Sequence, residues 1–139
     1  RQRLRGSIDR IDGDAASVRV IDFKTGRRAK SARQAEEDLQ LAAYQAAVRD
    51  GALDDTLGDG AGERLSGASL VYVGTGTRTA AVRTQTALPS AEDPDWFDRI
   101  VAQVGESLAG AQVQARRCGH CDLCAVRTSC PLQTEGAQL

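Results

Sequence analysis

The sequence predicts a mixed α/β fold, in which helices flank a mixed central sheet and a cysteine-rich segment follows at the C-terminal end. Three observations predict it. Two apolar, strand-like stretches near the start are joined by Asp12-Gly13-Asp14, a strong turn signal. Strand-like stretches return after a long run of helix-forming residues. All four cysteines lie between Cys118 and Cys130, so the last part of the chain differs in kind from the rest.

Each element follows from its local pattern. The expected strands cover residues 3–11, 17–25, 68–74 and 78–86. The expected helices cover residues 33–50 and about 90–109. Ser31 is placed to cap the first helix and Gly51 to end it, while Ser90 or Asp93 is placed to cap the second. Between these elements, the Gly- and Asp-rich stretch 51–67 is expected to be a long connection.

Apolar stripes predict which sides of the helices are buried. In the first helix, Leu41, Tyr44 and Val48 fall on one stripe. The second helix is predicted to be core along its stripe, which consists of Trp96, Phe97, Ile100, Val101, Val104 and Leu108. We divide the chain into a core over 1–113 and a cysteine-rich, cluster-binding tail over 114–139.

Composition sets further bounds. With 139 residues the chain has the size of one domain, and its formal net charge of −1 does not by itself indicate a nucleic-acid-binding protein. No apolar run is long enough to span a membrane and no secretory signal is recognisable, which favours a cytoplasmic protein without a membrane partner. Because the chain begins with an arginine and enters a strand almost at once, we expect it to be a piece of a longer protein.

The second strand ends with an acid and a lysine on one face. Residues two apart on a strand share a side of the sheet, so Asp22 and Lys24 continue the side of Val18 and Val20. Asp9 comes from the preceding strand. Two carboxylates suit a hard divalent cation such as Mg²⁺, which polarises phosphoryl oxygens and acidifies water. On spacing alone, the alternative is a solvated strand edge with a modest ion pair.

Basic residues flank these acids on both sides, as binding of a phosphate backbone would require. They are Arg1, Arg3, Arg5, Arg10, Arg27, Arg28, Lys30 and Arg33. A solvated basic surface is the alternative explanation.

Three stretches, in this order, resemble the nuclease domain of the RecB family within the PD-(D/E)xK superfamily. They are Gly6-Ser-Ile-Asp-Arg-Ile-Asp12, Val20-Ile-Asp-Phe-Lys-Thr-Gly26 and Gln40-Leu-Ala-Ala-Tyr44. The resemblance implies a restriction-endonuclease-like core. It also implies that Asp9 and Asp22 bind Mg²⁺ or Mn²⁺, with the carbonyl of Phe23 as a further ligand. Lys24 would be the catalytic lysine.

The resemblance also gives a role to the first helix. Gln40 and Tyr44 fall on the family's Gln-x-x-x-Tyr motif, which places Gln40 toward the acids or the DNA. Without the resemblance, Tyr44 would be read as core and Gln40 as surface. The family has a further helix, with a His or Glu ligand, before the first acid. That helix is not found in this sequence, so we assign no residue to this ligand.

The four cysteines follow the pattern C-x2-C-x2-C-x5-C, at Cys118, Cys121, Cys124 and Cys130. Their density, together with the lack of a secretory signal, predicts one shared centre rather than two disulfides. Four thiolates suit a tetrahedral zinc ion or an iron–sulfur cluster, and the spacing favours neither. His120, the only histidine, is not needed as a ligand.

The end of this segment is also similar to a known pattern. C-x2-C-x5-C followed by Pro131 resembles the C-terminal part of the iron–sulfur motif in the AddB and AdnAB branches of RecB-type nucleases, and Leu132-Gln133-x-Glu135-Gly136 is similar to the actinobacterial AdnAB tail. The resemblance implies a [4Fe–4S] cluster whose first cysteine lies far upstream. Cys118 is then a substitute fourth ligand or a bystander, and Zn²⁺ is the alternative.

The leading hypothesis is a Mg²⁺-dependent DNA nuclease domain of a bacterial helicase–nuclease that processes double-strand breaks. We expect its substrate to be single strands delivered by a helicase domain or partner subunit, because the chain has no G-x-x-x-x-G-K-[ST] loop. One alternative is a catalytically silent DNA-binding or subunit-docking module. Another is a free-standing zinc-ribbon domain, which leaves the two acidic strands unexplained.

Overall fold

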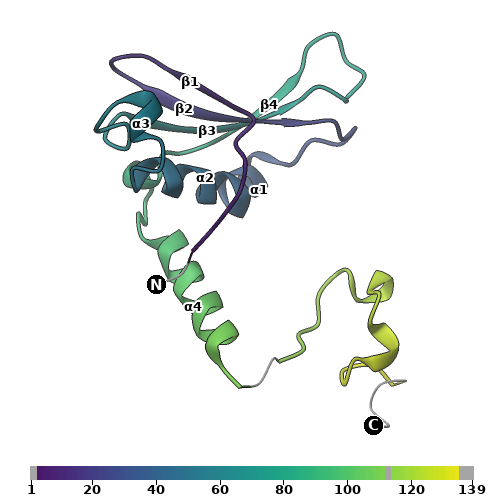
Figure 1. The fold of residues 1–139 in the computed structure, drawn as a ribbon. Helices are drawn as coiled ribbons and strands as arrows, with labels where there is room; N and C mark the ends of the chain where they lie inside the picture. Colours follow the sequence, from purple (N-terminus) through teal and green to yellow (C-terminus); the bar gives the residue numbers. More distant parts are fainter. Residues whose placement is uncertain (1–2, 112–113, 135–139) are drawn as a thin grey trace. The chain divides into compact units, whose positions relative to one another are not determined.

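The computed structural model describes residues 3–111 and 114–134, and its four strands form one mixed sheet (Figure 1). The strands are β1 Arg10–Gly13, β2 Val18–Lys24, β3 Leu65–Tyr72 and β4 Ala81–Gln85. Their order in the sheet follows the sequence. β1 and β4 are antiparallel to their neighbours, whereas the central pair β2 and β3 is parallel. This sheet, with helices beside it, confirms the predicted mixed α/β fold class.

Three helices lie in the crossover between β2 and β3, and the remaining helical segments of the described chain follow β4. They are α1 Ala32–Glu36, α2 Leu39–Arg49, α3 Asp54–Leu57, η1 Leu88–Ser90, α4 Trp96–Ala109, η2 Cys121–Leu123 and η3 Arg127–Ser129. α1 and α2 lie along one face of the sheet (Figure 1). The chain forms two compact units, one up to Val101 and one from Ala102 onward. No helix of the described residues is long and apolar enough to cross a membrane.

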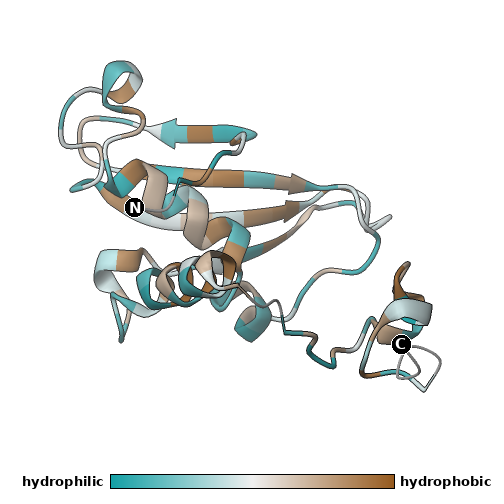
Figure 2. Ribbon diagram, turned by 60° about the horizontal axis from the view of Figure 1, so that its bottom comes forward, coloured by the Kyte–Doolittle hydropathy of each residue, from teal (hydrophilic) through white to brown (hydrophobic). Residues whose placement is uncertain are grey.

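The core lies between this face of the sheet and α2. Val18, Val20 and Leu70 are at most 1% exposed, as are Leu41 and Val48 on the helix. Apolar residues, brown in Figure 2, are concentrated in the central strands and in the helices beside them. The predicted stripe of Leu41 and Val48 is therefore confirmed, and it holds α2 against the parallel pair of strands.

The first strand is much shorter than the predicted 3–11. β1 covers only Arg10–Gly13, and residues 3–9 approach it outside the sheet. The turn also comes later than predicted. The carboxylate of Asp14 accepts hydrogen bonds from the backbone N–H groups of Ala16 and Ser17, both at 2.8 Å. This side-chain turn replaces the expected Asp-Gly turn and lets the strand continue through Gly13.

The predicted helix over 33–50 is in fact two helices. α1 ends at Glu36, and Asp38 begins α2 by accepting hydrogen bonds from the N–H groups of Gln40 and Leu41, both at 3.0 Å. A capping carboxylate requires non-helical backbone at its own position, which breaks the helix there. The predicted cap at Ser31 is confirmed, since its hydroxyl accepts from the N–H of Gln34.

Two further boundaries differ from prediction. The connection 51–67 contains α3, and β3 begins at Leu65 rather than at 68. The last helix begins at Trp96, after the short turn η1. The predicted caps Ser90 and Asp93 both lie further upstream than the residue before this helix. Its stripe is only partly core, because Phe97 is buried whereas Val104 and Leu108 are 51% and 74% exposed. The hairpin of β3 and β4 is confirmed.

Candidate active site

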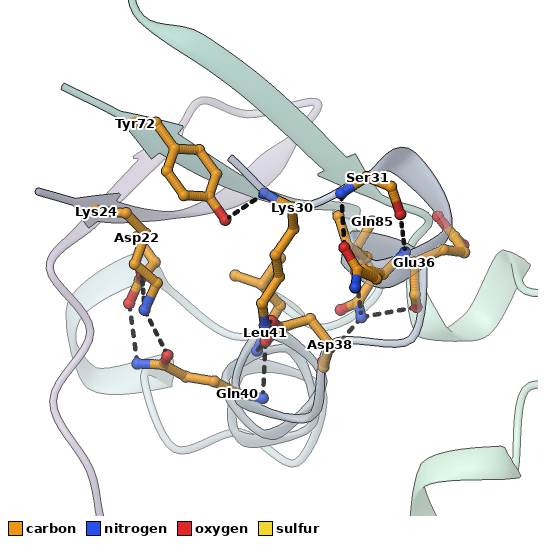
Figure 3. Close-up of polar contacts among 12 residues, drawn as sticks. Asp22, Lys24, Lys30, Ser31, Glu36, Asp38, Gln40, Leu41, Tyr72 and Gln85 are labelled. Atoms are coloured by element: carbon orange, nitrogen blue, oxygen red, sulfur yellow. Dashed lines mark hydrogen bonds and ion pairs between the residues drawn. The ribbon is translucent and has the colours of Figure 1, made fainter. Parts of the chain in front are cut away.

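The acid and the lysine lie where the two parallel strands end together. Asp22 and Lys24 follow Val18 and Val20 on the side of β2 that faces the helices, as the alternation predicts. The side chain of Asp22 is only 4% exposed, and its Oδ2 atom lies 2.7 Å from Nζ of Lys24 (Figure 3). Within the described chain, Oδ2 has no hydrogen bond of good geometry besides this ion pair.

Gln40 bridges this ion pair from the first turn of α2 (Figure 3). Its Oε1 accepts a hydrogen bond from Nζ of Lys24 at 2.7 Å, and its Nε2 donates to Oδ1 of Asp22 at 3.0 Å. An ammonium only donates and a carboxylate only accepts, so these two partners fix which way the amide points. The expectation that Gln40 points toward the acids is thereby confirmed for Asp22.

Tyr44 completes the bridge one helical turn later. Nε2 of Gln40 also donates to the Tyr44 hydroxyl at 2.8 Å, so both amide hydrogens are used. The tyrosine is half-buried and borders the core. Gln40 therefore contacts Asp22 and Lys24 and is held by Tyr44, which itself packs against the core.

Asp9 lies against the backbone that follows Asp22. Its Oδ2 accepts a hydrogen bond from the N–H of Phe23 at 2.9 Å. Arg10 pairs with Ile21 across β1 and β2, so the same register continued by one residue sets Asp9 opposite Asp22. The side chain of Phe23 is 43% exposed. That the carbonyl of Phe23 serves as a ligand stays a prediction.

This donor set fits a hard cation in its chemistry. It consists of the carboxylates of Asp9 and Asp22, and the Oδ2 atom of Asp22 is buried with the ammonium of Lys24 as its ion-pair partner. Mg²⁺ commonly takes one or two protein carboxylates and keeps several waters. Among the described residues, however, no group of three or more His, Cys, Asp or Glu side chains stands close enough to hold a metal ion. Asp9 and Asp22 are therefore the carboxylates that we assign to the cation, and water would complete its shell.

The local field also shapes the lysine. Burial lowers the pKa of Lys24, but the hydrogen bond and negative charge of Asp22 outweigh it, and the net pKa is raised above its usual value. Lys24 thus presents a positive charge beside the acid. Such a charge, on the face where the strands end, suits stabilisation of a negatively charged phosphoryl group.

A second ion pair beside the site was not predicted from the sequence. The carboxylate of Asp38, 3% exposed, contacts Nζ of Lys30, while the N–H of Lys30 donates to the hydroxyl of Tyr72 at 3.1 Å (Figure 3). Burial raises the pKa of Asp38, but Lys30 and the N–H groups of α2 lower it more, and the net pKa falls below its usual range. The sequence did contain a signal for Asp38. Aspartate is a common cap at the start of a helix, and Asp38 lies two residues before Gln40.

Two buried glutamines anchor the same region. Nε2 of Gln85 on β4 donates to the carbonyls of Ala35, Glu36 and Asp38, where α1 gives way to α2. Its Oε1 accepts from Nε2 of Gln45, which is fully buried on α2. These bonds satisfy carbonyls that a helix end leaves open. Gln45 lies one turn after Leu41 on the buried side of α2, whereas its bond to Gln85 joins two elements far apart in the sequence and is not visible in a local pattern.

The four cysteines lie in the second unit and line one hollow of ≈ 370 Å³. The Sγ atoms of Cys118 and Cys121 are 3.9 Å apart, and the N–H of Cys118 donates to Sγ of Cys121 at 3.2 Å. All four are free thiols, with none in a disulfide. Their chemistry fits a soft metal or an iron–sulfur cluster, although no three of them stand at metal-binding distance in the described segment. The predicted tail similarity at Glu135 and Gly136 lies outside the described residues.

The fold and this constellation together define a class. A mixed sheet whose central strand ends in a buried acid and a lysine, bridged by a helical glutamine, is the arrangement expected of a metal-dependent nuclease. The family model of the PD-(D/E)XK nuclease superfamily matches residues 2–131, and the chain belongs to that superfamily. Among curated proteins, none matches this chain significantly. The superfamily implies nuclease activity and DNA binding, and its members generally use divalent metals such as Mg²⁺.

Proposed function

We propose that this chain is a Mg²⁺- or Mn²⁺-dependent deoxyribonuclease that hydrolyses phosphodiester bonds at Asp22 and Lys24. One observation carries the proposal: the buried carboxylate of Asp22 lies 2.7 Å from the ammonium of Lys24 where the two parallel strands end, and Gln40 bridges the two groups. A strand edge of purely structural role would not bury an acid in this way and then bridge it from a helix.

Each residue takes a defined role in this proposal. Asp9 and Asp22 hold the cation, which when bound supplies Lewis-acid chemistry at the phosphate. Lys24 stabilises the negative charge that develops on the phosphoryl oxygens. Gln40 fixes the positions of the Lys24 and Asp22 side chains by hydrogen bonds to both, and Tyr44 fixes the amide of Gln40. In the net reaction, water adds to phosphorus, one P–O ester bond breaks, and the leaving oxygen takes a proton.

Cleavage of a labelled single strand in the presence of Mg²⁺ tests the site. We expect Asp22→Asn and Lys24→Gln to lower the cleavage rate by about 10²–10³-fold each, the scale of losing a charged group at the transition state. Asp22→Asn keeps the shape of the side chain, and Lys24→Gln removes the charge while leaving a polar side chain. Arg99→Ala serves as the matched control, because Arg99 is exposed and already pairs with Asp93.

The outcomes separate the proposals. Equal cutting by Asp22→Asn and the parent chain would remove the assigned site. A parent chain that binds DNA in the presence of Mg²⁺ yet does not cut it would favour the catalytically silent module, which the lack of a third metal-ligating side chain among the described residues also favours. The free-standing zinc-ribbon alternative loses support, because the family match extends over 2–131.

We further propose that the cysteines form a structural centre, as in the AddB and AdnAB branches of RecB-type nucleases, and that the chain serves a cytoplasmic helicase–nuclease in double-strand break processing. Its substrate would be single strands from a helicase domain or partner subunit. The four-cysteine hollow supports a shared centre. Two thiolates at about 2.3 Å from one zinc in a tetrahedron lie roughly 3.8 Å apart. The 3.9 Å separation of Cys118 and Cys121 therefore supports Cys118 as a ligand.

A further inference from the structure

Two loops continue from the carboxyl ends of the parallel strands, next to Lys24. The first covers residues 25–31 and follows β2, and the second covers residues 73–80 and follows β3. Both extend from the same edge of the sheet, on the right in Figure 1. We call them the β2 loop and the β3 loop. Because the parallel strands end in register, with Lys24 opposite Tyr72, both loops leave the sheet beside the candidate active site.

The two loops are held together by their backbones. The N–H of Val73 donates to the carbonyl of Lys24 at 2.9 Å. A Cβ atom on Gly74 would lie only 1.9 Å from the carbonyl oxygen of Thr25, so only glycine permits this approach. Arg83 on β4, just after the β3 loop, holds the β2 loop as well, since its Nε donates to the carbonyl of Lys30 at 2.8 Å. The two loops are therefore in contact where they leave the sheet, rather than separate from each other.

The charge of this surface is one-sided. Neither loop contains an aspartate or a glutamate, although the chain has 19 acids and a net charge of −1. Arg27, Arg28 and Arg78 are exposed, and no ion pair joins any of them to an acid of the described residues. Lys30 differs, because Asp38 already neutralises it. Three exposed guanidinium groups without an acidic partner among the described residues give the two loops a net positive charge, which attracts an anion.

We propose that the β2 and β3 loops form a phosphate clamp that grips the nucleic-acid backbone on either side of the phosphate presented to Asp22 and Lys24. Arg27 and Arg28 hold the strand from the β2 loop and Arg78 holds it from the β3 loop. Guanidinium groups suit this task because their forked N–H donors match phosphate oxygens. The clamp rests on the proposed function only in that the gripped strand is the substrate; the binding itself requires no cleavage.

Binding is measured apart from cutting, with the full chain in chelator and a fluorescent oligonucleotide followed by anisotropy. The combined variant Arg27→Ala, Arg28→Ala, Arg78→Ala is expected to weaken binding by at least about tenfold, a conservative figure for lost charge-assisted bonds. The slope of log Kd against log salt for single strands should fall by about 2, at roughly 0.7 per lost contact. Arg99→Ala removes one charge elsewhere and should leave both quantities near the parent values.

Further variants and substrates distinguish loss of the clamp from other causes of weak binding. Replacing the same three arginines by lysine should restore most of the binding, which excludes misfolding as the cause of the loss. Single- and double-stranded oligonucleotides show which form the clamp prefers. With Mg²⁺ present, the alanine variant should raise KM far more than it lowers kcat. If the triple alanine variant keeps the salt slope of the parent chain, the clamp proposal is wrong. The variant Asp22→Asn tests the active site alone: normal DNA binding without cleavage by this variant leaves the clamp proposal standing.

Discussion

At the scale of single residues, the central feature is an amide with two opposite ends. Gln40 offers a carbonyl to Lys24 and an N–H to Asp22, so it satisfies both members of an ion pair at once. No ionised side chain does this, because a carboxylate would repel Asp22 and an ammonium would repel Lys24. Tyr44 uses the second amide hydrogen and thereby limits rotation of the group. The amide is a positioning group rather than a reacting one.

Replacing the amide therefore gives a sharp prediction. Gln40→Met keeps the length of the side chain and removes all three hydrogen bonds. We expect the single-turnover cleavage rate to fall by about 10–100-fold, since hydrogen bonds to charged groups contribute roughly 1.5–3 kcal/mol. DNA affinity, measured by anisotropy, should change little. Tyr44→Phe removes one neutral bond and should cost only a few-fold by the same scale. A parent-like rate for Gln40→Met would mean that Lys24 needs no bridge.

At the scale of elements, the start of α2 decides where this amide lies. Asp38 begins the helix by accepting two of its N–H groups and is itself held by Lys30, so three contacts fix the turn that carries Gln40. Gln85 fixes the preceding carbonyls from β4. The break between α1 and α2 therefore positions Gln40. It lies two residues after Asp38, whose contacts fix the start of α2, and its amide reaches Asp22.

The ion pair of this cap predicts a dependence of stability on pH. The pKa of Asp38 is lower in the folded protein than its ordinary value of about 3.9, so its charge stabilises the fold above that value. The stabilisation is lost as pH falls through the folded pKa. Asp38→Asn keeps a capping oxygen and lacks the charge. We expect the denaturation midpoint of the parent to exceed that of Asp38→Asn at pH 7, and the difference to shrink below about pH 4. A difference that stays constant down to pH 3 would contradict this account.

The same elements show what was and was not predictable from the sequence. Alternation in β2 placed Asp22 and Lys24 on the buried face, because burial and charge follow period two on a half-covered strand. The break at Asp38 was not predictable from propensity, since the residues around it favour helix and the break rests on side-chain bonds of Asp38 and Gln85. Likewise, Asp14 moved the first turn through hydrogen bonds to its neighbours. The bridge from Gln40 to Asp22 spans two elements, so local pattern gives no access to it.

At the scale of the whole molecule, the two units differ in what holds them. The first has a core of fully buried Val, Leu and Ala side chains. In the second, none of residues 114–134 is buried, and the backbone is held by short turns such as η2 and η3. A segment this small without a core usually depends on a metal or on cross-links, and its thiols are free. We therefore expect the cysteine segment to depend on its centre for structure, while the sheet does not.

Metal removal tests this division. We expect the purified chain to contain either about one zinc ion or iron with visible absorbance, and a chelator or acid treatment to remove it. Residues 114–134 should then be digested faster by a protease, because free thiols and turns alone do not close the segment. The unfolding midpoint of the first unit should stay unchanged, since its core contains no cysteine.

Two serine variants decide which cysteines matter. Cys124→Ser removes a ligand that the pattern requires, so metal content and protease resistance should both fall. Cys118→Ser should do the same if the 3.9 Å pair with Cys121 marks two ligands on one ion, and should leave the metal in place if Cys118 is a bystander. Retention of metal by Cys124→Ser would show that the segment does not use these thiols as a shared centre. The hollow lined by all four cysteines would then serve another purpose.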